Sequence, residues 1–471
     1  MGKIKYLVSA LLLVTAIANA NLVLEPTAAT VAGNYYKQTY HTTSGILTLV
    51  YTERSSDGQA VYYVFNVNSN NGFVIVSAED AGHAIIGSSN KGSYIIPANN
   101  SNPSFWMTSR KNEIISIRAN NIRATSDISN EWNAYINNIG RSTHRAMSSV
   151  DSVSPLCTTT WNQSPFYNSM CPDLSVTGCV ATAMAQIMRY WAYPSTGTGS
   201  NCYDEETGGG YSENYGQLCA NFDTSNYVWS AMPDKLATPN KEVAKLMYDC
   251  GVSVNMDYSP SGSGAYVMGG YPSAQYSYVN NFGYDGNTLN SAMYDSSEDT
   301  AWISLLENEL NNKRPMQFQG FDSAGGGHTW VCDGYNPVNE MHMNWGWNGS
   351  DDGYYAVTNL NPTPYVWVSG IGVLYGIQPP PGALAIQQVS DKTAITVYPN
   401  PSQGIFNFNI TGNNSSYIIK IYNVLGQEIY SSLINSGKTE IGLANQSKGI
   451  YLYKVLTQSG ETISTGKLVV E

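Results

Sequence analysis

The spacing of apolar residues predicts different secondary structure along the chain. Apolar and polar positions alternate over 62–66, 72–77 and 93–97, as in half-buried strands, and helical spacing follows over 103–120 and again up to 138. Beyond residue 389 the chain breaks into short alternating runs separated by turn sequences. These runs span 395–398, 404–410, 417–422, 428–433, 449–456 and 462–470. Their length and spacing predict a small β-sandwich at the C-terminal end.

A helical pattern in the middle of the chain opens on a cysteine. Gly178 and Cys179 end an irregular segment, and the next apolar positions recur three or four residues apart. They are Val180, Ala181, Met184, Ile187, Met188 and Trp191. This spacing puts Cys179 at a helix N-terminus, where unpaired N–H groups and the helix dipole lower the pKa of a thiol. Cys179 is therefore a candidate nucleophile, although a buried cysteine on such a helix is also an ordinary core residue.

An isolated histidine and an amide follow far downstream. Three glycines precede His328, and residues 329–333 have the pattern of a strand, so we expect the ring to be held on a sheet edge. Asn344 comes after a hairpin-like stretch, and its carbonyl oxygen can accept from the imidazole and fix its tautomer. The order Cys, His, Asn is typical of a papain-like thiol hydrolase. His328 taken alone is also compatible with a core histidine.

Charge and composition exclude several kinds of partner. Only 12% of the 471 residues are charged, the formal net charge is −12, and Lys and Arg form no dense stripe. Nucleic acid and anionic membrane surfaces are therefore not expected as partners. His328, Cys332 and His342 are the alternative metal ligands, but no CxxC or HExxH spacing accompanies them, so we expect no metal and no other cofactor.

The seven cysteines are an odd number, which in an exported chain allows three disulfides and one free thiol. Four lie in loop-like sequence and can pair in an oxidising compartment: Cys157, Cys171, Cys202 and Cys219. Cys250 and Cys332 fit a buried helix end and a strand. The sequence does not fix the connectivity.

The two ends of the chain indicate export and a domain boundary. Lys3 and Lys5, an apolar run over 6–17 and the small residues 18–20 predict a signal peptide at 1–20 and no other membrane span. A Pro-Pro-Pro-Gly stretch at 379–382 marks a boundary. The predicted domains are 21–145, 146–380 and 389–471, with a linker at 381–388.

Six motifs, in one order, resemble the streptopain family of cysteine peptidases, which includes interpain-type enzymes. They are WNQSPFYN at 161–168, TGCVATAMAQIMRYWAYP at 177–194, DYSPSGSGA at 257–265, GGGHTWVCDGY at 325–335, MHMNWGWNG at 341–349 and LYGIQP at 374–379. The resemblance implies an α+β papain-like catalytic domain over 146–380. Its helix layer would carry Cys179, and its antiparallel sheet would carry His328 and Asn344.

The resemblance also implies roles for individual residues. Cys179 corresponds to the nucleophile, His328 to the general base and Gln163 to the side-chain donor of the oxyanion hole, with the Cys179 N–H as second donor. Such a donor is worth about 3 kcal/mol in acyl transfer, whereas Gln163 alone is compatible with an ordinary loop residue. Asn344 and Trp345 correspond to residues that orient and shield the histidine.

Further residues are implied for the substrate cleft. Trp347 resembles a residue that lines it, together with Gly327 before the histidine. Ser261 and Ser263 belong to a Gly/Ser-rich loop that the resemblance places against the substrate backbone, while such a loop is otherwise a plain surface segment.

The flanking domains carry resemblances of their own. Residues 21–145 resemble the inhibitory α+β propeptide of the same family, which need only block the cleft or displace His328. We expect processing near Arg145, in a polar linker, although an N-terminal domain that stays attached is the alternative. Residues 389–471 resemble the sorting domain of the type IX secretion system, with YPNP at 398–401, YNVLGQ at 422–427 and KLVV at 467–470. A carbohydrate-binding or adhesive sandwich is the alternative there.

The chain is therefore predicted to be the zymogen of a papain-like cysteine endopeptidase that cleaves protein or peptide substrates through a thioester. Its partners would be its own propeptide and the type IX secretion machinery, and it would be secreted or held at the cell surface. The alternatives are a catalytically weak surface adhesin or binding protein on the same fold, and an amidase or transglutaminase that uses the same residues.

Overall fold

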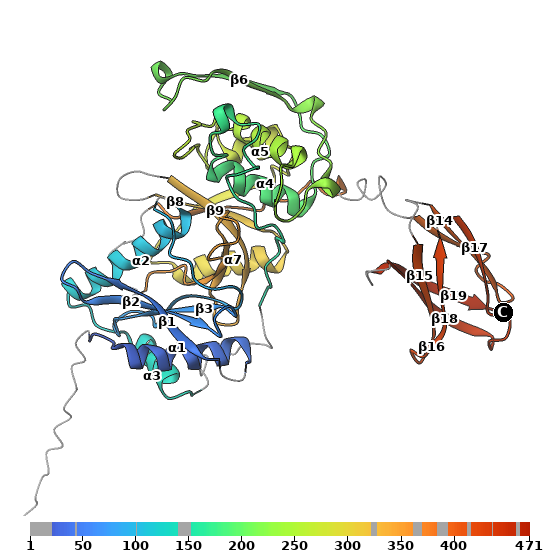
Figure 1. Cartoon of the computed structure of the whole chain (residues 1–471), viewed down its shortest axis with the longest axis horizontal. Coiled ribbons are helices and arrows are strands. Elements are labelled where there is room, and N and C mark those ends of the chain that lie inside the picture. The colour runs from blue at the N-terminus through green and yellow to red at the C-terminus, as the bar shows by residue number, and fades with distance from the viewer. Residues whose placement is uncertain are drawn as a thin grey trace, which may run out of the picture. The chain divides into compact units, whose positions relative to one another are not determined.

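The computed structural model describes residues 21–42, 45–99, 101–139, 152–321, 327–360, 370–383, 394–411, 416–435, 437–457 and 462–471. The chain forms two compact units, Met1–Pro380 and Pro381–Glu471 (Figure 1). The signal peptide predicted at 1–20 and the processing site predicted near Arg145 lie outside the described residues. The first unit has an N-terminal part, residues 21–139, and a central part, residues 152–380.

The N-terminal part is a four-stranded antiparallel meander covered by helices on both faces. Its elements are α1 (Glu25–Tyr40), β1 (Leu47–Arg54), β2 (Ala60–Val67), β3 (Phe73–Ser77), β4 (Ile85–Ser89), α2 (Asn102–Ala119) and α3 (Ser126–Ile136). Helices α1 and α3 pack on one face of the strands and α2 on the other (Figure 1). Every residue of β2 is buried because both faces of this strand are covered. The strands predicted over 62–66 and 72–77 form within β2 and β3, and α2 and α3 match the predicted helical stretches. The strand predicted over 93–97 is wrong, because the N–H groups of Tyr94 and Ile95 donate to side-chain oxygens and not to a neighbouring strand.

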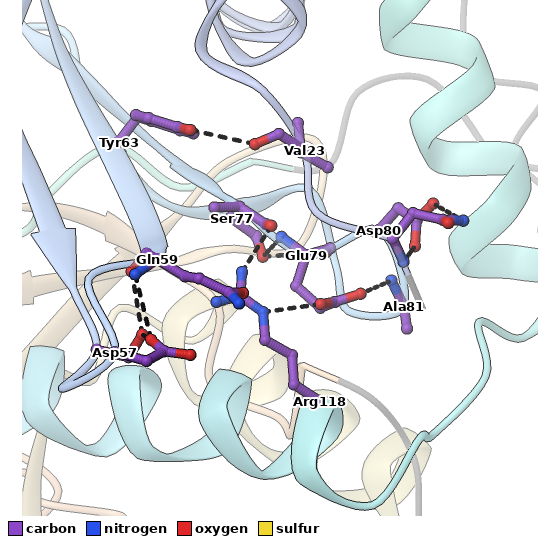
Figure 2. A network of polar contacts seen from close by, with 12 residues as sticks. Val23, Asp57, Gln59, Tyr63, Ser77, Glu79, Asp80, Ala81 and Arg118 are labelled. Carbon is purple, nitrogen blue, oxygen red and sulfur yellow. Dashed lines mark hydrogen bonds and ion pairs between the residues drawn. The ribbon is translucent and has the colours of Figure 1, made fainter. Parts of the chain in front are cut away.

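A polar network fastens the C-terminal end of α2 to the turn between β3 and β4 (Figure 2). Arg118 Nε donates to Glu79 Oε2 at 2.9 Å, and Arg118 also donates to the carbonyl of Ala78 at 2.7 Å. The other Glu79 oxygen accepts from the N–H of Ala81 at 3.3 Å. Glu79 is buried, so these bonds offset the cost of removing its charge from water. They hold α2 in a fixed position on the strands.

The central part has a helical half and a sheet half. Its helices are α4 (Cys179–Trp191), α5 (Lys241–Ser253), α6 (Ala274–Asn280) and α7 (Asp299–Asn311), with short 3-10 turns at Pro172–Leu174, Thr207–Gly209, Phe222–Thr224 and Trp229–Ala231. Its strands are β5 (Ser200–Glu205), β6 (Gly216–Asn221), β7 (Asn290–Met293), β8 (Met316–Phe321), β9 (Gly327–Tyr335), β10 (Met341–Asn344), β11 (Gly353–Tyr355) and β12 (Gly372–Tyr375). Helix α4 packs on one face of β8 and β9, and α2 and α7 pack on the other (Figure 1).

Strands from both parts form one ten-stranded sheet. Its order is β1-β2-β3-β4-β11-β10-β9-β8-β12-β7, and all its neighbours are antiparallel. The junction is β4 against β11, where Ser88 faces Tyr354 and Gly87 faces Tyr355. The N-terminal part therefore extends the sheet of the central part and covers an edge strand of it. The predicted α+β fold, a helix layer over an antiparallel sheet, is confirmed.

The second unit is a β-sandwich. Strands β13 (Ala394–Tyr398), β14 (Ile405–Thr411) and β17 (Gly437–Gly442) form one sheet, and β15 (Ser416–Asn423), β16 (Glu428–Asn435), β18 (Gly449–Thr457) and β19 (Thr462–Val470) form the other. Alternate side chains of the two sheets make a core of its own. The predicted sandwich is confirmed, and β17 is a strand that the sequence pattern did not indicate.

The disulfide pairing differs from one of the sequence expectations. A disulfide joins Cys202 to Cys219 across the β5–β6 hairpin. Cys157 and Cys171, which could have paired, are buried free thiols, so the three bridges that the count allowed do not form among the described residues. Cys250 and Cys332 are buried in α5 and β9, as expected. Within the part of the chain that the structure describes, no helix is both long and apolar enough to cross a bilayer.

Candidate active site

Cys179 is the first residue of α4, as the apolar spacing predicts. Gly178 precedes it with φ +82°, and a Cβ at this position would lie 2.7 Å from the Met256 sulfur and 3.0 Å from the Ser263 carbonyl oxygen. Only glycine fits this backbone conformation at so close an approach. The turn into the helix is therefore fixed immediately before the candidate nucleophile.

The pKa of the Cys179 thiol is raised in this structure, which differs from the lowering expected at a helix N-terminus. Burial is the main cause, and hydrogen bonds from the backbone of Thr329, Cys179 and Val180 oppose it only in part. The contact with the Thr329 backbone places the thiol against β9, next to His328. The structure thus brings the two predicted reacting residues to facing elements, α4 and β9.

His328 is held by two residues of the N-terminal part. It lies near the start of β9, opposite Gly320 on β8. Its Nδ1 is 3.3 Å from Asn102 Oδ1, and its ring stacks on Phe105 with the centroids 4.8 Å apart and the planes at 20°. Both Asn102 and Phe105 lie in the first turns of α2.

Asn102 bridges the backbone around the histidine. Its Nδ2 donates to the carbonyl of Thr329 at 2.7 Å and to that of Trp345 at 2.8 Å, and the residue is 2% exposed. Because Nδ2 serves two carbonyls, Oδ1 must be the acceptor, so His328 Nδ1 carries the proton in this arrangement. Asn102 therefore fixes both the position and the tautomer of His328.

Asn344 faces α4 rather than the solvent side of the sheet. Its Nδ2 donates to the carbonyl of Thr159 at 2.6 Å, and its Oδ1 accepts from Gln186 Nε2 at 3.0 Å and from the N–H of Gly346 at 3.2 Å. The sequence interpretation gave the Asn344 carbonyl to the imidazole of His328. In this structure the imidazole Nδ1 faces Asn102, and the Asn344 amide is engaged elsewhere.

The two tryptophans after Asn344 have different environments. Trp345 is fully buried, donates from Nε1 to the carbonyl of Asp351 at 3.0 Å and lies 5.2 Å from the ring of Trp330. Trp347 is partly exposed, and its Nε1 has no hydrogen-bond partner among the described residues. Trp345 therefore belongs to the aromatic core that contains Trp106 and Trp330, and only the Trp347 side chain is partly exposed.

Gln163 is partly exposed and lies beside the approach to the nucleophile. Its carbonyl accepts from the N–H of Thr177, two residues before Cys179, at 3.3 Å, and its own N–H donates to Asn162 Oδ1 at 2.8 Å. These backbone contacts bring the Gln163 segment to the start of α4, as an oxyanion donor requires.

The remaining candidates for the cleft are only partly accessible. Ser263 is buried, and its hydroxyl donates to the carbonyl of Val176 at 2.7 Å, so it braces its loop against the segment before Cys179. Ser261 is exposed, and its hydroxyl lies 3.2 Å from that of Ser259. Gly327 is the first residue of β9, opposite Phe321.

Three residues that contact this site were absent from the sequence interpretation: Asn102, Phe105 and Gln186. The first two reach His328 from more than 220 residues away in the chain, and no local pattern signals such a contact. Gln186 had a signal, because it is a long polar side chain within the apolar stripe of α4. Among the described residues, no group of three or more His, Cys, Asp or Glu side chains is placed to hold a metal ion.

Comparisons with known proteins match three consecutive segments of the chain. Residues 20–114 match the Spi protease inhibitor family, residues 161–355 match the Peptidase C10 family, and residues 396–471 match the secretion system C-terminal sorting domain. The second segment contains Gln163, Cys179, His328 and Asn344. The first contains Asn102 and Phe105.

Individual relatives match across these segments. The thiol protease/hemagglutinin PrtT of Porphyromonas gingivalis is 27% identical over 80% of this chain, which spans only 44% of that protein. Streptopain of Streptococcus pyogenes is 30% identical over 67% of this chain and 78% of its own length. A solved structure of a prointerpain A fragment from Prevotella intermedia has a TM-score of 0.58 and 27% identity, and it covers 72% of this chain and 100% of the fragment.

Proposed function

The chain belongs to the peptidase C10 family of cysteine peptidases, also called the streptopain family, and on that premise we propose that it cleaves peptide bonds with Cys179 as nucleophile and His328 as general base. The observation that carries this assignment is the packing of α4, which begins at Cys179, against β9, which carries His328. A backbone hydrogen bond from Thr329, the residue after His328, also acts on the pKa of the Cys179 thiol. No other free cysteine begins an α-helix, and the other four, all in described parts of the chain, are buried.

Each proposed residue has one step in the reaction. The Cys179 thiolate attacks the peptide carbonyl and forms a thioester, while His328 gives a proton to the departing amine and then activates water. The negative charge that builds on the carbonyl oxygen is held by the Gln163 amide and the Cys179 N–H. Trp347 lines the cleft, and the 257–265 loop contacts the substrate backbone.

The structure has the features of an inhibited precursor. The N-terminal part matches a protease inhibitor family, and its residues Asn102 and Phe105 contact the ring of His328. In this state Nδ1 of the proposed general base faces Asn102 Oδ1, and burial raises the pKa of the Cys179 thiol. We propose that the propeptide is 21–145, that the mature peptidase is 146–380, and that cleavage near Arg145 separates them.

Labelling with a thiol-directed irreversible peptide inhibitor tests the assignment. After processing at neutral pH we expect one label per chain, on Cys179, and loss of peptidase activity in proportion to labelling. The four other free thiols are buried and serve as internal controls, since they react only when the protein unfolds. Full labelling of Cys179 with undiminished peptidase activity would refute the proposal, and a folded chain without any peptidase activity would favour the adhesin alternative.

The C-terminal unit supplies a separate prediction about export. It matches a sorting domain and has a core of its own, so the protein is directed to the cell surface or the medium. Deletion from Val389 onward is expected to leave the activity of the purified enzyme within about twofold, because the deletion removes nothing from the first unit. In its native cell the truncated chain should stay in the periplasm.

Cell fractionation followed by immunoblotting measures this outcome. Leu468→Asp places a charge in the sandwich core and should trap the chain as the deletion does, whereas Lys448→Ala on the surface should leave export unchanged. Arrival of the truncated chain in the medium at the wild-type level would show that the sorting signal lies elsewhere.

A further inference from the structure

Gln186 is a buried polar residue of α4, two turns after Cys179, and it makes three hydrogen bonds to other segments. Its Oε1 accepts from the hydroxyl of Thr159 at 3.0 Å and from the N–H of Trp161 at 3.1 Å. Its Nε2 donates to Asn344 Oδ1 at 3.0 Å. The residue is 1% exposed, so these bonds are made without competition from water.

The direction of every bond in this cluster is fixed by backbone groups. The N–H of Trp161 can only donate, so it must face Gln186 Oε1, and Nε2 then points at Asn344. The N–H of Gly346 can only donate and the carbonyl of Thr159 can only accept, which orients the Asn344 amide in the complementary way. The two amides therefore form one consistent network. A flip of the Gln186 amide would lose two bonds, and a flip of the Asn344 amide would lose three.

This network joins the elements that carry the proposed catalytic groups. Trp161 lies two residues before Gln163, Gln186 belongs to the helix that begins at Cys179, and Asn344 ends β10, the strand beside the His328 strand. The two donors of the oxyanion hole come from separate segments, the 161–168 stretch and α4. Their separation depends on the contacts between these segments. Gln186 provides the hydrogen bond to Trp161, and its bond to Thr159 holds the residues just before the same stretch.

We infer that Gln186 is a positioning residue that sets the distance between Gln163 and Cys179 for oxyanion stabilisation; this inference rests on the proposed function. Gln186 itself does not touch the substrate. A side-chain amide is suited to this role because its oxygen accepts and its nitrogen donates hydrogen bonds. The Gln186 oxygen binds the segment that leads to Gln163, and the Gln186 nitrogen binds Asn344 at the end of β10. Gln186 acts on acylation through Gln163, and Asn344 is its partner rather than the partner of the His328 ring in this state.

Replacement of Gln186 by methionine tests the inference, since methionine keeps the length of the side chain and removes all three bonds. In full-length chain processed by immobilised wild-type enzyme, which is then removed, we expect kcat to fall about 10- to 100-fold. KM should stay within about threefold of the wild type. The rate of alkylation of Cys179 by iodoacetamide should also stay within about threefold, because alkylation needs a thiolate and no oxyanion hole.

Thr159→Val removes only the hydroxyl that donates to Gln186 Oε1 and leaves the other bonds of the network in place. It should lower kcat less than Gln186→Met, and the double variant should be no slower than Gln186→Met alone, since both changes break one link. Gln217→Met is the control, because Gln217 is exposed on β6 and its amide also donates to an oxygen, that of Asp204 at 3.4 Å. This control should keep wild-type kcat.

Two results would overturn the inference. One is a folded Gln186→Met or Thr159→Val enzyme with kcat within about twofold of the wild type. The other is a parallel fall of kcat and alkylation rate, which would mean a loss of active molecules. Failure of the proposed function itself would look different, because the wild-type enzyme would then show no activity that depends on Cys179.

Discussion

Replacement of Cys179 by alanine is expected to lower peptide hydrolysis by the processed enzyme by about four orders of magnitude or more, to the level of a reaction without a nucleophile. The thioester forms at this sulfur, and hydrogen bonds from Gln163 or the backbone cannot replace a covalent step. The fold should persist, since alanine has the highest helix propensity and Cys179 is only partly buried at the first position of α4.

The same variant should remain full-length when it is incubated alone and should be cut when a trace of active wild-type enzyme is added. Gel electrophoresis over time and a fluorogenic peptide assay measure the two effects. Cys171→Ala is the matched control, because Cys171 is a buried free thiol in the same half of the central part. It is expected to keep its kcat and lose some stability. Turnover by Cys179→Ala within tenfold of the wild type would end the assignment of the nucleophile.

Much of the architecture follows from local pattern. The apolar spacing after Cys179 is that of a helix with one broad buried face, and α4 forms over Cys179–Trp191. Alternation of apolar and polar positions marked most strands of the C-terminal sandwich, because one face of each sheet is buried and the other is wet. Helix α1 was missed although its buried residues recur at helical spacing and a proline stands at its start. Alanine and tyrosine carry most of its buried face, which weakens the apolar signal.

The arrangement around His328 could not be predicted in the same way. Residue types and their order pointed to Cys179, His328, Asn344 and Gln163, but the partners of these side chains depend on contacts between distant segments. The Asn344 amide turns toward Gln186 because Thr159 and Gly346 supply the matching backbone groups. The disulfide between Cys202 and Cys219 similarly depends on the register of the β5–β6 hairpin, where these two residues face each other.

The high pKa of Cys179 follows from the same inhibited arrangement. A helix N-terminus lowers the pKa of a thiol, but the effect is at most a few kcal/mol, and here the effect of burial outweighs it. The sequence shows the helix start and cannot show the desolvation. In the intact chain, we therefore expect the thiol to react with alkylating agents mainly above the ordinary pKa of cysteine, with a rate that rises with pH.

Release of His328 from the N-terminal part is expected to change this behaviour. Asn102→Ala together with Phe105→Ala should speed both self-processing and alkylation of Cys179 at pH 7 by at least about tenfold in the intact chain. The pair removes three hydrogen bonds of about 0.5–1.5 kcal/mol each and one ring contact of about 0.5–1.5 kcal/mol, all of which favour the inhibited state. The freed imidazole can then pair with the thiol and lower its pKa, so the pH profile of alkylation should shift toward lower pH.

Alkylation of Cys179 is quenched at early times and quantified by mass spectrometry, which measures the alkylation rate before self-processing occurs. Thr108→Ala is the control, since Thr108 is exposed on the same helix and should leave both rates unchanged. The continuous sheet through β4 and β11 remains in the double variant, so the N-terminal part should stay folded onto the central part, and its thermal unfolding should remain a single transition. The intact double variant could instead keep the wild-type alkylation rate and pH profile. Burial alone would then make the thiol unreactive, and the contacts of Asn102 and Phe105 with His328 would not contribute to inhibition.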